Sequence, residues 1–96
     1  LARIRAEAER TGALAAYDLL RAEAARAGQA AEETKELLAG AAASYQLGES
    51  GLTDLLDTLR AALAARITAL EVREAALAAH RDLEAATGRP FTGDLP

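Results

Sequence analysis

The chain has 96 residues, a formal net charge of -4 and a charged fraction of 27%, with both signs interleaved. Alanine accounts for 27 residues and aromatic residues for only 3%, while methionine, tryptophan and cysteine are absent. This composition argues against an enzyme pocket lined by bulky side chains, excludes disulfides and thiolate metal sites, and disfavours nucleic-acid binding, which requires a basic surface.

The first predicted element is a helix over about residues 2–46. It consists mainly of Ala, Leu, Arg and Glu, which are strong helix formers, and it contains no proline. Gly12, Gly28 and Gly40 each cost about 1 kcal/mol relative to alanine inside a helix, so we expect bends or fraying at these positions. The chain begins at Leu1 rather than at a methionine, and we therefore expect it to be a segment of a larger protein.

A polar, glycine-bearing turn at residues 47–51 leads into a second predicted helix over about residues 52–87. Its leucines recur every seven residues, at Leu56, Leu63, Leu70 and Leu77, flanked by Leu52, Leu55, Leu59 and Leu83. This spacing is typical of the seam of a left-handed coiled coil, so we expect these leucines to form the contact with the first helix. Gly88 is expected to cap the helix and Pro90 to stop it, which leaves residues 88–96 as a tail or loop.

These elements predict an all-α fold, in which residues 1–87 form a long antiparallel helical hairpin. Position i then lies opposite roughly 99 minus i, so the leucine-poor stretch Ala22 to Ala31 lies opposite Leu70 and Leu77, and large side chains face small ones. A two-helix hairpin buries only one stripe per helix. We therefore expect it to associate with further helices, in a larger protein or in an oligomer.

The turn and the start of the second helix read YQLGESGLTDLLD over residues 45–57. This stretch resembles the periplasmic tip of the TolC-like outer-membrane efflux proteins, in which a Tyr-x-x-Gly turn precedes an aliphatic-x-Asp/Glu-aliphatic-Leu-Asp run. The downstream pattern, with LR at 59–60, HRDLE at 80–84 and TGRP at 87–90, is similar to the returning helix of that family, especially its metal-efflux branch. Ser50 is a departure, because some relatives carry a basic residue there.

The resemblance implies that the chain is the second of two hairpins in each protomer of a homotrimer, whose twelve helices form a periplasmic α-barrel. It implies a passive conduit for small molecules or metal ions in a Gram-negative bacterium, docked by a periplasmic adaptor protein and, through it, by an inner-membrane pump. Contact with the outer membrane is then made by other parts of the protein. No cofactor and no nucleic acid are implied.

The resemblance also assigns roles to residues around the turn. Asp54 and Asp57 match carboxylates that ring the narrow mouth of the pore in some members. Three-fold symmetry would bring the carboxylates of three protomers toward one axis, where their negative charge attracts cations. Tyr45 matches a tyrosine that contacts a neighbouring hairpin and helps to hold the mouth closed. The surface implied to dock the adaptor consists of Leu47, Gly48, Glu49, Ser50 and Gly51.

Each of these residues also has an ordinary structural explanation. Asp54 and Asp57 lie in the first turns of a helix, where an acidic side chain stabilises the positive end of the macrodipole by roughly 0.3 to 1 kcal/mol. Asp57 is also spaced to pair with Arg60. Tyr45 suits packing at a helix end, the glycines suit positive φ angles, and either Ser50 or Gly51 suits the cap of the second helix.

No catalytic constellation is visible, so an enzyme is not expected. His80 is the single histidine and has only Glu84 as a possible second ligand at i+4, so we expect no metal site. The alternative to the efflux duct is a generic coiled-coil scaffold or oligomerisation module without a transport role. The adaptor's own hairpin fits the turn less well, and a lipid-surface helix is disfavoured by the mixed charges and scarce aromatics.

Overall fold

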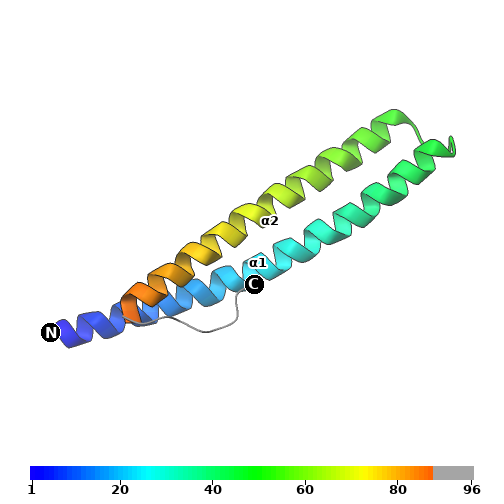
Figure 1. Ribbon diagram of the computed structural model, residues 1–96. Helices are drawn as coiled ribbons and strands as arrows, with labels where there is room; N and C mark the ends of the chain where they lie inside the picture. Colours follow the sequence, from blue (N-terminus) through cyan, green and yellow to red (C-terminus); the bar gives the residue numbers. More distant parts are fainter. Residues whose placement is uncertain (88–96) are drawn as a thin grey trace. The chain divides into compact units, whose positions relative to one another are not determined.

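The computed structural model describes residues 1–87, which form two helices (Figure 1). Helix α1 spans Ala2–Gln46 and helix α2 spans Leu52–Thr87, and no strand occurs within the described residues. The all-α prediction is therefore confirmed. The predicted Gly88 cap, the Pro90 stop and the tail at residues 88–96 lie outside the described part of the chain.

Helix α1 is unbroken through its three internal glycines, so the fraying expected there is not found. A Cβ built at Gly12, Gly28 or Gly40 would meet no other atom within 4 Å, so no close approach of another segment requires these glycines. The helix formers around them are sufficient to carry α1 across each position.

The two helices are organised into two compact units. The first contains residues 1–25 of α1 and the part of α2 from residue 71 onwards. Its core is a cluster of Tyr17, Ala79 and Leu83, against which Ala13 and Leu20 pack. Tyr17 is only 1% exposed and is the largest fully buried side chain of the described residues. Because a buried tyrosine ring contributes far more apolar area than alanine, this unit depends on Tyr17.

The second unit contains residues 26–70 and is a helical hairpin around the turn at residues 47–51 (Figure 1). Its partly buried residues follow steps of three and four along both helices, which is the periodicity of coiled-coil packing. On α1 they include Ala27, Ala31, Thr34, Leu38 and Ala41, and on α2 they are Leu55, Thr58, Ala62, Ala65 and Ala69. The contact between the helices is therefore made mostly by small side chains.

The leucine seam predicted from the sequence is wrong for this unit. The predicted seam leucines are exposed by 53%, 39%, 36%, 52% and 54% at Leu52, Leu56, Leu59, Leu63 and Leu70, whereas Leu55 is half-buried. Two seven-residue patterns lie one position apart on α2, and the alanine-rich one faces α1. Alanine lets two helices approach closely, and one residue of rotation then carries the leucines about 100° around α2, into solvent.

Candidate functional site

The turn at the tip begins with a hydrogen-bonded cap on α1. The Glu49 amide donates to the Ser44 carbonyl at 2.9 Å, and the Gly48 amide donates to the Tyr45 carbonyl at 3.0 Å. This pair of bonds is a Schellman motif, which requires a left-handed residue at the position of Gly48. Gly48 has a φ of +76°, as such a cap demands, so the predicted positive φ is confirmed at Gly48, whereas Gly51 does not have one.

The cap of α2 distinguishes between the two candidates named from the sequence. The Gly51 carbonyl accepts a bond of 3.4 Å from the Leu55 amide, the first such bond of α2, so Gly51 rather than Ser50 is the N-cap residue. Leu47 is 72% exposed next to Gly48, and Tyr45 is also exposed. The tip therefore presents an apolar leucine and a tyrosine ring to solvent beside polar backbone.

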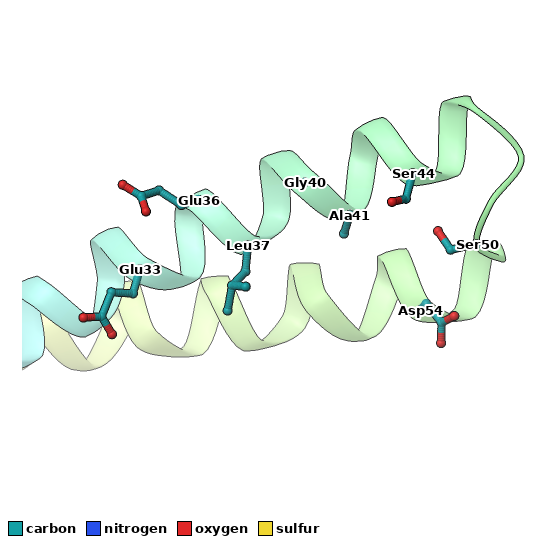
Figure 2. Close-up of a pocket in the computed structure, with 8 residues that line it drawn as sticks. All are labelled: Glu33, Glu36, Leu37, Gly40, Ala41, Ser44, Ser50 and Asp54. Atoms are coloured by element: carbon teal, nitrogen blue, oxygen red, sulfur yellow. The ribbon is translucent and has the colours of Figure 1, made fainter.

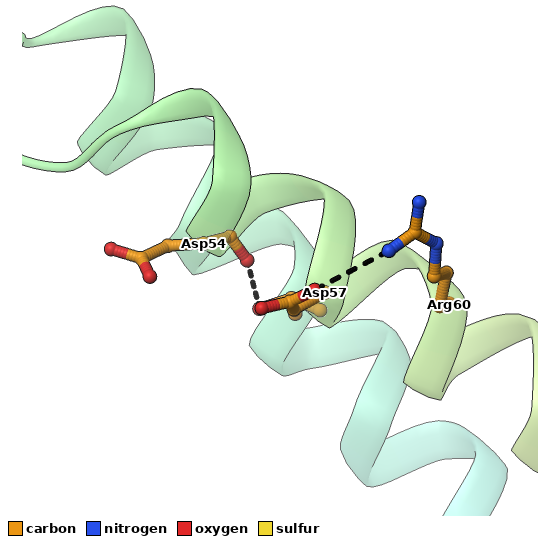
Figure 3. A network of polar contacts seen from close by, with 4 residues as sticks. Asp54, Asp57 and Arg60 are labelled. Carbon is orange, nitrogen blue, oxygen red and sulfur yellow. Dashed lines mark hydrogen bonds and ion pairs between the residues drawn. The ribbon is translucent and has the colours of Figure 1, made fainter.

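Asp54 and Asp57 follow the tip on α2, and both are exposed. Asp54 lies in the first turn of α2, where its negative charge interacts favourably with the positive end of the helix macrodipole. Its backbone carbonyl accepts a 2.9 Å hydrogen bond from the Thr58 hydroxyl. Asp57 pairs with Arg60 at 3.5 Å, which confirms the pairing expected from their spacing. Figure 3 shows the Asp54 carboxylate directed away from Asp57, so the two carboxylates do not converge within one chain.

A groove next to the tip is lined from both helices, with Glu33 and Glu36 at one end and Asp54 at the other (Figure 2). We call it the acidic groove, and it is lined by Glu33, Glu36, Leu37, Gly40, Ala41, Ser44, Ser50 and Asp54. Its lining contains three carboxylates and no basic side chain. The groove as a whole is therefore acidic, because the sequence places Glu33 and Glu36 on the neighbouring helix.

A second groove of the residue 26–70 unit is apolar, and the sequence analysis missed it. We call it the leucine groove, and it is lined by Gly28, Ala31, Glu32, Lys35, Leu38, Leu59, Ala62, Leu63, Arg66, Ala69 and Leu70. The seven-residue spacing of the leucines was its signal in the sequence, but that signal was assigned to the wrong face of α2. The leucine groove is an exposed apolar surface, the kind that marks an interaction site.

A polar cluster occupies the other unit. The His80 Nδ1 lies 2.8 Å from the Glu84 Oε1, and the His80 ring contacts Tyr17 with centroids 5.7 Å apart and planes tilted by 57°. The His80 side chain is only 12% exposed. Within the described residues no group of three or more His, Asp or Glu side chains is placed to hold a metal ion. The cluster therefore orders the core around Tyr17, which the sequence analysis did not single out.

Two further findings bear on identity. Over residues 1–87, neither helix combines the length and the apolar character that crossing a membrane requires. Comparisons with protein-family models, with curated proteins and with solved structures yield no significant match. The case for a function therefore rests on the residues and the geometry described above.

Proposed function

We propose that this chain is a segment of the periplasmic α-helical wall of a TolC-like outer-membrane efflux duct, acting as a passive conduit for small molecules or metal ions. One observation carries the proposal: α2 bears a seam that faces α1 and, beside it, a second apolar stripe that is exposed. A helix in the wall of an α-barrel has a neighbour on each side, and it therefore needs two such stripes.

The residues at the tip fit the same proposal. In a trimeric duct, Asp54 and Asp57 of each protomer supply the acidic ring at the mouth, and Tyr45 contacts the adjacent hairpin. Both carboxylates are exposed, and Asp54 borders a groove that Glu33 and Glu36 line farther from the tip. Like charges held close together attract cations and oppose the passage of anions. The mouth is accordingly proposed to select for cations.

The exposed tip is the proposed docking surface for a periplasmic adaptor and, through the adaptor, for an inner-membrane pump. It consists of Leu47, Gly48, Glu49, Ser50 and Gly51, all exposed except the half-buried Ser50, with Leu47 as the apolar anchor. Replacing Leu47 with serine should weaken adaptor binding, as measured by calorimetry with the purified adaptor. The matched control is Leu19→Ser, which alters a leucine that is 59% exposed on α1, far along the chain from the tip.

The acidic mouth is tested by single-channel conductance of the full-length protein in planar bilayers. We expect Asp54→Ala combined with Asp57→Ala to reduce cation selectivity and block by a multivalent cation. The control is Glu33→Ala combined with Glu36→Ala, which removes the same charge farther from the tip. If the two double variants have equal effects, Asp54 and Asp57 contribute no more to cation selectivity than other negative charges of the hairpin. If no pores form, the duct is refuted.

A second candidate function is a coiled-coil scaffold or oligomerisation module without transport. The leucine groove favours the scaffold function, because a stripe of exposed leucines on a hairpin can pack against a helix of any partner. The full-length protein distinguishes the two functions, since only the duct requires a second, similar hairpin and pore activity.

A further inference from the structure

The two walls of the leucine groove carry side chains of different size. On α2, the wall carries Leu59, Leu63 and Leu70, all exposed. On α1, the facing wall is small at Gly28 and Ala31 and carries Leu38 closer to the tip, and a Cβ at Gly28 would meet nothing within 4 Å. Leu70 and Gly28 are equally far from Glu49 along the chain, so they lie at the same level on opposite walls. The Leu70 side chain of one copy therefore fits against Gly28 of a second copy that faces it.

Two of the three charged residues of the groove are also complementary between two copies. The α1 wall carries Glu32 and Lys35, and the α2 wall carries Arg66. Glu32 and Arg66 are equally far from Glu49 along the chain, so in an antiparallel hairpin they lie at the same level. A two-fold rotation about an axis parallel to the helices keeps both tips at one end. It sets Glu32 of each copy opposite Arg66 of the other, which gives two opposite-charge pairs.

The acidic groove offers no such match. Its charged residues are Glu33, Glu36 and Asp54, with no base among the lining residues, so two copies meeting there would repel each other. The opposite orientation of copies across the leucine groove, with tips at opposite ends, is also less favourable. It stacks the α2 leucines of the two copies on each other, which overpacks that half of the contact.

We propose that two copies of this chain pair face to face through their leucine grooves, with both tips at the same end, to form a four-helix bundle over residues 26–70. The contact buries the leucines that the single hairpin leaves exposed, as helical bundles require. It depends on this surface alone. The proposed duct assigns the same leucine stripe to a neighbouring helix of the barrel, so the pairing and the duct give this surface alternative partners. Dimerisation tests the pairing, and pore activity tests the duct.

Disulfide trapping in the 96-residue chain tests the orientation, because the native sequence contains no cysteine. Leu63 and Lys35 lie at the same level on opposite walls, so Leu63→Cys in one chain and Lys35→Cys in a second, larger tagged chain should cross-link when mixed and oxidised. The control partner is Ala43→Cys, an exposed position of α1 in neither groove, which should give no more product than random collision.

The outcomes separate the possibilities. Mixed Leu63–Lys35 cross-links support the proposal, whereas dominant Leu63–Leu63 self-links overturn it in favour of tips at opposite ends. Sedimentation of the unmodified chain should show a dimer, and a monomer at 100 µM overturns the pairing altogether. Glu32→Arg should weaken the dimer by about tenfold and Glu32→Arg with Arg66→Glu should restore it, with helix content checked by circular dichroism. Failure of the double variant to restore dimerisation also overturns the proposal.

Discussion

Replacing Tyr17 with alanine removes the largest buried side chain among the described residues. Tyr17 is 1% exposed, packs with Ala79 and Leu83, and makes the ring contact with His80. Truncation of a buried aromatic residue to alanine typically costs 3 to 5 kcal/mol, and an aromatic pair contributes roughly 0.5 to 1.5 kcal/mol beyond its buried area. Because the rest of this core is mainly alanine and one leucine, we expect a loss of at least about 3 kcal/mol.

Urea denaturation followed by circular dichroism measures this loss. With a slope of about 1 to 3 kcal/mol per molar urea, the midpoint should fall by roughly 1 to 3 M. Hydrogen exchange should show faster exchange in residues 1–25 and 71–87 than in residues 26–70, because Tyr17 belongs to the first unit. The matched control is Leu19→Ala on the same helix, where the side chain is 59% exposed and the expected change lies within about 0.5 kcal/mol. Equal midpoint shifts for the two variants would refute the assignment of Tyr17 as the core residue of this unit.

Three further predictions concern the tip and its neighbourhood. Gly48→Ala should lower the free energy of unfolding by about 1 to 2 kcal/mol in urea titrations, because φ is +76° at this position. Gly40→Ala should raise the same free energy by up to about 1 kcal/mol, because Gly40 lies inside a helix with open space around it, so destabilisation by both substitutions would contradict the distinction between the two glycines. Arg60→Ala should change the free energy of unfolding by less than about 1 kcal/mol, because the ion pair with Asp57 is well exposed. A larger loss in the same assay would show that the ion pair is structurally important. Asp54→Ala should cost roughly 0.3 to 1 kcal/mol at low ionic strength and less in high salt, and a loss independent of salt would exclude the macrodipole as its cause.

The helices and the turn could be predicted from the sequence because local interactions specify them. Helix formers without proline continue α1 from Ala2 to Gln46, and the polar turn stops it. Gly48 is required by its left-handed cap, which depends only on the residues around it. The exposed positions of the tip follow in the same way, since the ends of two helices leave their connecting residues in solvent.

The acidic groove could be anticipated only in part. Asp54 was identified as a candidate from the sequence, whereas Glu33 and Glu36, which are both exposed, were not. That they line the same groove as Asp54 depends on the register between α1 and α2, which no local pattern specifies. The role of Tyr17 was missed for the same reason, because its burial depends on His80 and Leu83 from the far end of α2.

The sequence by itself determined two helices, their connecting turn and a seven-residue apolar period, because these depend on interactions within a few residues along the chain. Only the tertiary structure decided which of two patterns on α2 faces α1. The stripe through Leu56, Leu63 and Leu70 and the stripe through Leu55, Ala62 and Ala69 share the same period, so periodicity cannot rank them. The structure places the small residues between the helices, where they permit close approach, and this choice leaves the leucines exposed for another helix.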